Sequence, residues 1–231
     1  MSPDQNAMPK TARSKGYVPP PIVGEGYPLT DLQRSLLDRA ERLGREKFAP
    51  RAEKYDREAS FPFENYADMR DEGMLGLCVP TAYGGLGADF PTYCMTAATI
   101  GRYCGATALT FNMHACSTLW SGVLSDDLDM TPEQRERHHA NRAVHFERVV
   151  KHGKVYAQPF SEGSAAAAGK APFGTTATKV DGGWLLNGEK ALITNAPVAD
   201  VAVVFAATDK DAGPGGVTMF VVDLSLAGVS R

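Results

Sequence analysis

The stretch WLLNGEKALITNAPVADVAVVFAAT, residues 184–208, decides how the second half of this 231-residue chain is expected to fold. Its apolar and β-branched runs favour β-structure, and they predict strands over 191–194 and 201–206. The Asn187-Gly188 pair inside it is the strongest short signal of a β-hairpin turn. The stretch therefore predicts a compact set of short β-strands.

Two neighbouring runs extend this β pattern. Residues 176–180 read as a strand followed by a turn at 181–183, and residues 217–222 read as another strand after a loop of glycine and proline. Short, closely spaced strands of this kind are expected to pack as an antiparallel β-sandwich or barrel.

The chain before this region shows helical periodicity instead. Thr30, with Gln33 three residues later, forms a capping box, and apolar residues then recur every three or four positions. Pro50 is expected to end or bend this first helix, because proline lacks the N–H that a helix interior needs. Thr131 and Pro132 read as an N-cap followed by proline at the first helical position, so they predict the start of a later helix.

The domain organisation follows from this change of period. The predicted fold class is α+β, with an all-α helical domain over 29–150 and a middle β-domain over 151–231. Residues 1–28 are polar and then proline-rich. We expect them to form a flexible arm, since such a segment buries too little apolar surface to order itself.

The overall composition is that of a soluble globular protein. Hydrophobic residues make up 43% and charged residues 22%, and Lys+Arg 24 against Asp+Glu 27 give a formal net charge of −3. This slightly acidic balance argues against a dedicated nucleic-acid binder. The most apolar window, 198–207, is too short to span a membrane and contains Asp200. We expect a cytoplasmic protein with no nucleic-acid partner and no membrane span.

Cysteine and histidine residues give no sign of a metal site. The four cysteines show neither a C-x-x-C pair nor zinc spacing, and the adjacent His138 and His139 point in different directions on a helix. His114 lies in an apolar helical segment and is interpreted as a core histidine with satisfied hydrogen bonds, with a catalytic role as the less favoured alternative.

The loop over 156–168 is the most unusual part of the predicted β-domain. It places Gln158, Ser161 and Ser164 between two strands and continues into a run of alanines. Hydroxyls and amides in such a loop suit the carbonyls and nitrogens of a flat polar ring, and small side chains let the backbone approach. A flexible surface loop has the same composition, so the residues alone leave both interpretations open.

A second candidate segment is Leu192-Ile193-Thr194, at the end of the strand predicted after the Asn-Gly turn. An apolar pair followed by a hydroxyl suits one face of a ring and a phosphate or ring nitrogen beside it. An ordinary strand that ends in a turn is the alternative.

Taken together, several stretches resemble the acyl-CoA dehydrogenase family of flavoproteins. They are VPTAYGGLG at 79–87, LTFNMHA at 109–115, AQPFSEGSA at 157–165, the stretch 184–208 and GVTMFVVD at 216–223. The run from Asn187 through Lys190 to Asn195 is the most specific part. The resemblance extends from about residue 30 to the end of the chain.

This resemblance implies FAD bound non-covalently between the β-domain and the helices. Ser161 stands where the family has a threonine whose hydroxyl bonds the pyrimidine edge of the flavin, and Gln158 would begin the flavin-contacting loop. Ser164 would correspond to a serine near the phosphates. Leu192 takes the place of a ring-stacking aromatic residue, and Thr194 that of a hydroxyl near the central flavin nitrogen or a phosphate. Metal ligands are not implied.

The implied activity is α,β-dehydrogenation of an acyl-CoA thioester in fatty acid metabolism, by a homo-oligomer whose electron acceptor is not identified. A carboxylate would remove the α-proton, and the β-hydrogen would pass to the flavin as hydride. In the family that carboxylate belongs to a C-terminal helical bundle, and the chain stops at Arg231. The chain therefore looks truncated before its catalytic domain, and the catalytic base is unknown.

Departures from the family pattern keep two alternatives open. Gly163 replaces the usual proline after the glutamate, and Leu192 replaces the common tryptophan or phenylalanine. A flavin-dependent monooxygenase on the same scaffold is one alternative, because the loop pattern around 163–168 is altered, the base is missing and a fold does not fix a reaction. An inactive fragment or interaction domain is the other.

Overall fold

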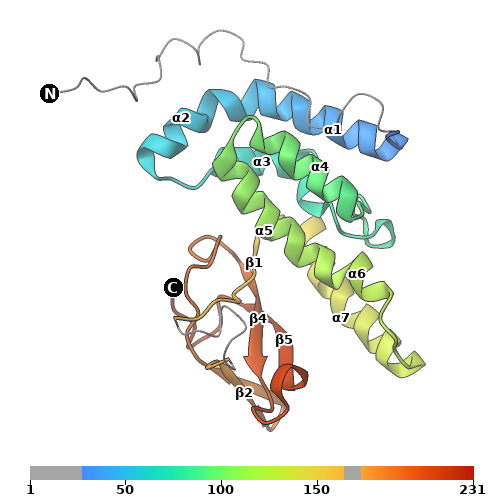
Figure 1. The fold of residues 1–231 in the computed structure, drawn as a ribbon, viewed down its shortest axis with the longest axis vertical. Coiled ribbons are helices and arrows are strands. Elements are labelled where there is room, and N and C mark those ends of the chain that lie inside the picture. Colours follow the sequence, from blue (N-terminus) through green and yellow to red (C-terminus); the bar gives the residue numbers. More distant parts are fainter. Residues whose placement is uncertain (1–27, 164–172) are drawn as a thin grey trace, which may run out of the picture.

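The computed structural model describes residues 28–163 and 173–231, and in this part of the chain all α-helices precede the strands (Figure 1). The α-helices are α1 (Asp31–Leu43), α2 (Ala49–Glu58), α3 (Phe63–Asp71), α4 (Phe90–Gly101), α5 (Gly105–Ser121), α6 (Val123–Asp126) and α7 (Pro132–Val150). The strands are β1 (Tyr156–Ala157), β2 (Thr176–Val180), β3 (Gly183–Asn187), β4 (Val201–Ala207) and β5 (Val217–Asp223). The predicted arm over 1–28 lies, apart from its last residue, outside the described residues.

Both predicted helix starts are confirmed. The Thr30 hydroxyl accepts the N–H of Gln33, and the Gln33 side chain accepts the N–H of Thr30, which closes the capping box of α1. Thr131 forms the same reciprocal pair with Gln134, and Pro132 is the first residue of α7. Each box satisfies backbone donors that have no partner inside the helix.

The prediction that Pro50 ends or bends the first helix agrees with the structure in one respect: α1 ends at Leu43, and Pro50 is an early residue of a separate α-helix. A turn of π-helix at Gly44–Phe48 joins α1 to α2, and its last bond runs from the Ala49 N–H to the carbonyl of Gly44. Pro50 follows as an early residue of α2. Wider π-helical bonding removes the need for the N–H that proline lacks, so the helical path continues to Glu58.

A single mixed sheet replaces the antiparallel sandwich or barrel that the composition predicted. β5 pairs antiparallel with β4 along all of Val201–Ala207. The other edge of β4 is shared by β1 at its start and β2 at its end, and both pairings are parallel. Long connections over 158–175 and 188–200 explain the difference, because they let strands return in the same direction where a tight turn cannot.

The hairpin predicted at Asn187-Gly188 was also wrong. The turn predicted at 181–183 is confirmed and makes the hairpin: Gly182 has a φ of 78°, and β2 pairs antiparallel with β3. The strand predicted over 191–194 does not form. Leu192 has a φ of 58° and Asn195 a φ of 73°, and these left-handed conformations are incompatible with an extended strand.

Helix α5 connects the helical half to the sheet, and one cluster of buried hydrophobic residues runs from the helices into β1 and β4. The ring of His114 on α5 is fully buried; its Nε2 lies 2.9 Å from the Leu75 carbonyl oxygen, and its Nδ1 accepts the Tyr156 N–H at 3.1 Å. The interpretation of His114 as a satisfied core histidine is therefore confirmed. Its ring fixes the start of the sheet against α5.

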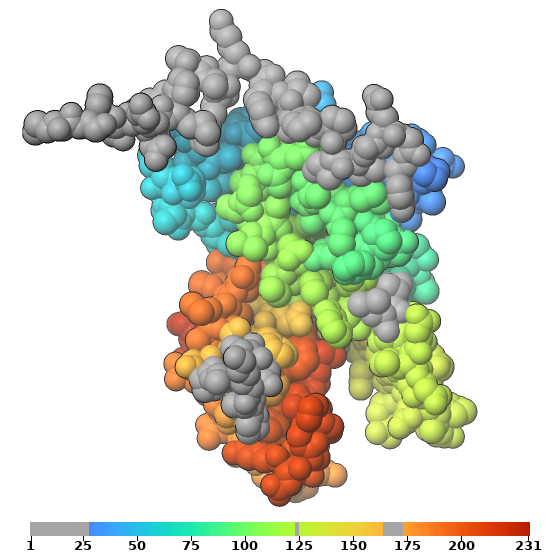
Figure 2. Space-filling view, in the orientation of Figure 1, coloured from blue at the N-terminus to red at the C-terminus, as the bar shows by residue number. Residues whose placement is uncertain are grey.

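Figure 2 shows the strand-bearing half and the α7 helix as two neighbouring projections below the remaining helices. None of the described helices combines the length and apolar character that crossing a lipid bilayer requires. Over the same residues, no three His, Cys, Asp or Glu side chains gather in a way that could hold a metal ion.

Candidate functional site

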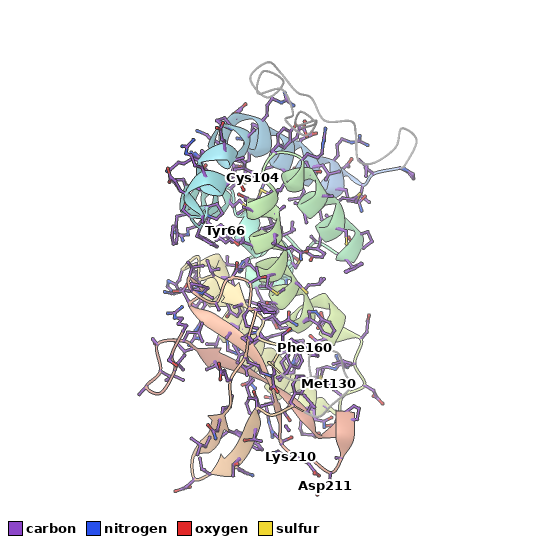
Figure 3. All side chains as sticks on the ribbon, turned by 60° about the vertical axis from the view of Figure 1, so that its left-hand side comes forward. Tyr66, Cys104, Met130, Phe160, Lys210 and Asp211 are labelled. Carbon is purple, nitrogen blue, oxygen red and sulfur yellow. The ribbon has the colours of Figure 1, made fainter. Side chains whose placement is uncertain are left out.

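The first segment of the candidate site leaves β1 at residue 158. Phe160 anchors it, because its ring packs edge-on against Phe173 at 5.1 Å and Phe205 at 5.2 Å between ring centres. Figure 3 labels Phe160 in the strand-bearing half, and Tyr66 in the helical half. Between β1 and this anchor lies Gln158, whose Oε1 is buried without a hydrogen-bond partner among the described residues.

Glu162, two residues after Phe160, carries a buried carboxylate. Its Oε1 accepts from Lys190 Nζ at 2.7 Å and from the Thr175 N–H at 3.0 Å, and its Oε2 accepts the Gly174 N–H at 2.7 Å. Burial by itself would raise the pKa of Glu162, but these hydrogen bonds outweigh it and lower the pKa to about 2. Glu162 is therefore ionised at neutral pH and engaged on both oxygens.

The second segment, residues 190–195, lies directly against the first. The Ala191 N–H donates to the Ser161 carbonyl at 2.9 Å, which brings the two predicted segments together. Immediately afterwards the backbone of Leu192 turns left-handed and leaves its side chain 97% exposed. A leucine rarely adopts this conformation, which costs about 1–2 kcal/mol, so the exposed apolar side chain is held there by its surroundings.

Asn195 anchors the far end of the second segment. Its buried side chain donates from Nδ2 to the Thr110 carbonyl at 2.9 Å and to the Tyr156 carbonyl at 3.1 Å. One amide group thereby joins the turn to α5 and to β1. The 192–194 turn is fixed at both ends, by Ala191 on one side and by Asn195 on the other.

Between Ala191 and Asn195, and at the neighbouring Ser161, several polar groups have no hydrogen-bond partner among the described residues. Within the described residues, the hydroxyls of Ser161 and Thr194 make no hydrogen bond, and the N–H groups of Leu192 and Ile193 donate to no other residue. Two hydroxyls, free amides and an exposed apolar side chain suit a ligand that is both flat and polar at its edges.

Five of the six predicted site residues are thus described, in two adjoining segments: Gln158, Ser161, Leu192, Ile193 and Thr194. Ser164, the sixth, lies outside the described residues. Sequence reasoning missed the roles of Lys190 and Asn195, although both belong to the most specific stretch of the resemblance. The local sequence gives no signal that pairs Lys190 with Glu162, since Glu189 is the carboxylate directly beside this lysine.

Comparison with known proteins identifies the family to which the sequence of this chain is similar. Two family models match the chain, the acyl-CoA dehydrogenase N-terminal domain over residues 30–139 and the acyl-CoA dehydrogenase middle domain over residues 160–231. The mitochondrial 2-methylacyl-CoA dehydrogenase of Solanum tuberosum is 31% identical over 206 residues, which cover 87% of this chain and 47% of that protein.

Two solved structures are similar in fold as well. Butyryl-CoA dehydrogenase from Megasphaera elsdenii has a TM-score of 0.71 and 27% identity, over 87% of this chain and 51% of that one. KijD3, solved with FMN and a dTDP-linked keto sugar, has a TM-score of 0.71 and 28% identity, over 88% and 47%. The chain spans about half the length of these relatives. Because the two family models together match most of its residues, the chain belongs to the acyl-CoA dehydrogenase family.

Proposed function

We propose that this chain is the helical and β part of an FAD-dependent oxidoreductase that introduces a double bond between the α and β carbons of an acyl-CoA thioester. The observation that carries the proposal is the contact between residues 158–163 and 190–195 through the Ala191–Ser161 hydrogen bond. In a member of this family, two adjoining segments with uncommitted hydroxyls and amides are best explained as a flavin-binding edge. The names of the relatives, which describe acyl-CoA dehydrogenases, support the choice of substrate.

The residues present fit a flavin. Ser161 and Thr194 would direct their hydroxyls to the ring edge and its substituents, Leu192 and Ile193 would cover ring carbons, and Gln158 would lie behind them. KijD3, a neighbour of similar fold, was solved with FMN, which supports a flavin on this scaffold. When bound, FAD supplies the acceptor for the hydride from the β carbon. The chain itself would position the ring through the residues of these two segments.

The catalytic base is proposed to lie outside the two matched domains. Glu162 is the carboxylate nearest in sequence to the candidate hydroxyls, but both of its oxygens are occupied by Lys190, Gly174 and Thr175. A carboxylate held ionised by three donors is a poor base, since its proton affinity is lowered.

We infer a helical domain over 29–150 and a β-domain over 151–231. The whole protein would be a cytoplasmic homo-oligomer of fatty acid metabolism that passes electrons to a partner not yet identified. Light scattering of the purified protein, together with fractionation of the cells that make it, tests these assignments.

The hydroxyl pair provides the direct test of the flavin site. Replacing Ser161→Ala and Thr194→Ala is expected to weaken FAD binding about 5-fold each and roughly 25-fold together, because a neutral hydrogen bond contributes about 1 kcal/mol. FAD titration of the chain, followed by quenching of flavin fluorescence, measures the affinity. Ser60→Ala removes an exposed hydroxyl in the helical half and should leave it unchanged. Unaltered affinity in the double variant would exclude this site.

Leu192 provides a gain-of-affinity test. Leu192→Trp keeps the left-handed backbone cost that leucine already bears, and it restores an aromatic face that can stack on the flavin. We expect FAD to bind roughly 2- to 10-fold more tightly, equivalent to about 0.5–1.5 kcal/mol for an aromatic pair. Leu226→Trp, at a leucine that is 57% exposed, is the matched control. Equal affinity in wild type and Leu192→Trp would place the flavin ring elsewhere.

A flavin monooxygenase on the same scaffold is the second candidate function, because a shared fold does not fix the reaction and neither matched domain supplies the proposed base. The two functions differ in what happens to the reduced flavin. In the protein that contains this chain, a dehydrogenase is expected to lose its flavin colour on addition of acyl-CoA and to release an enoyl product. A monooxygenase would instead consume oxygen after chemical reduction and form no enoyl product.

A further inference from the structure

The buried pair of Glu162 and Lys190 has an arrangement that goes beyond simple charge neutralisation. We propose that it is a positioning pair, which sets the distance between the 158–163 and 190–195 segments and thereby aligns Ser161 with the 192–194 turn. The inference rests on the proposed function, because the two segments are the candidate flavin-binding edge. It assigns a role to two side chains that would not touch the reacting atoms.

The contacts of Glu162 extend the pair to a third segment. The Gly174 and Thr175 N–H groups both donate to its carboxylate, at 2.7 and 3.0 Å. These residues lie just before β2, whose first residue Thr176 pairs with Ala207 at the end of β4. The carboxylate is therefore fixed to the frame of the sheet, and Lys190 is attached to that fixed point.

Lys190 is enclosed as tightly as its partner. Its ammonium lies 2.7 Å from Glu162 Oε1, 3.3 Å from the Phe160 carbonyl oxygen and 4.2 Å from the centre of the Phe173 ring. The side chains of Lys190 and Glu162 are only 9% and 5% exposed. The next residue, Ala191, donates to Ser161, so Lys190 controls the backbone bond that joins the two segments.

The cost of burying this pair indicates that it serves geometry more than stability. Removing two charges from water costs several kcal/mol per ion, and well-packed apolar residues often stabilise a fold equally well. A charged pair instead permits few arrangements, because each ion must keep all of its donors or acceptors. The pair therefore constrains Ser161 and Leu192 more narrowly than apolar packing would.

The test uses two single variants of the full chain and measures amide hydrogen exchange without flavin. In Lys190→Met, the Ala191 amide is expected to exchange at least about tenfold faster, while Gly174 and Thr175 keep their acceptor and change little. In Glu162→Gln, all three amides should exchange faster. Val203 in β4 serves as the internal reference, and Lys151→Met, which breaks the exposed pair with Glu147, is the matched control.

FAD titration of the same proteins gives the second readout. Both variants are expected to bind FAD about tenfold more weakly with a Val203 exchange rate close to that of wild type, and Lys190→Arg should recover part of the affinity. A purely structural role would raise exchange at Val203 as well and would leave the affinity of the folded fraction intact. That result, or unchanged exchange at Ala191, would overturn the proposal.

Failure of the proposed function gives a different pattern. If the wild-type chain binds no FAD, the flavin assignment fails while the exchange pattern still decides whether the pair holds the two segments together. If either variant fails to fold, Lys190→Arg is compared with wild type. Lys190→Gln, which removes the charge, is then measured beside it: the Ala191 amide should exchange faster in Lys190→Gln than in Lys190→Arg, and equal rates count against the proposal.

Discussion

Replacing His114 with phenylalanine is expected to lower the free energy of unfolding by about 4 kcal/mol, since each buried backbone group left without a partner costs about 1–3 kcal/mol. The ring of His114 is fully buried and satisfies both the Leu75 carbonyl and the Tyr156 N–H. Phenylalanine fills a similar volume but offers neither a donor nor an acceptor. Chemical denaturation of wild type and variant measures the difference.

The same histidine predicts a dependence of stability on pH. Burial lowers the pKa of His114 to about 4, from an ordinary value of 6.5. The unfolded chain therefore takes up a proton between these values that the folded chain does not, so the stability present above pH 6.5 is lost as the pH falls toward 4. This contribution amounts to about 3 kcal/mol.

Phenylalanine does not titrate, so the stability difference between His114→Phe and wild type should shrink by that amount at low pH. His152→Phe, at an exposed position just after α7, is the control and should change the stability by less than about 0.5 kcal/mol. If the difference in unfolding free energy between wild type and His114→Phe stays constant from neutral pH to below about pH 4, His114 is not the titrating group.

Replacing Gly85 with alanine is expected to lower the free energy of unfolding by roughly 3 kcal/mol, because a side chain forced into filled space displaces backbone. Gly85 belongs to the glycine-rich loop between α3 and α4. A Cβ atom built on it would overlap the carbonyl oxygen and the Cβ of Val79. Val79 is fully buried, so the loop cannot give way without moving the core.

Gly105→Ala is the matched control for this prediction. Gly105 is the first residue of α5, it is exposed, and a Cβ atom there meets nothing within 4 Å. Alanine restricts the unfolded chain and favours the helix, so it should stabilise the protein by about 0.5 kcal/mol. Opposite signs for the two glycine variants in thermal unfolding are the expected result, and equal effects would contradict the role assigned to Gly85.

The parts of this protein that could be predicted from sequence are those determined over a few residues. The capping boxes at Thr30 and Thr131 begin their helices as predicted, since each box is complete within four positions. The valine-rich strands β4 and β5 also formed where composition placed them. The family resemblance added the two site segments, which residue types alone left open to a plainer interpretation.

Tertiary contacts determine the strand pairing, the position of the turns and the buried partners. Where a local sequence signal conflicts with these contacts, the structure follows the contacts. Asn187-Gly188 is the stronger hairpin signal, yet a Cβ at Gly188 would collide with Thr175, so this glycine lets two segments meet where a turn was expected. Glu162 pairs with Lys190, 28 residues away in the sequence, and His114 accepts a hydrogen bond from Tyr156, 42 residues away. Sequence determined the caps, the strand composition and the family. Only the folded chain decided the parallel pairing and the buried partners, because the free energy of a buried charge or ring depends on groups that no local window contains.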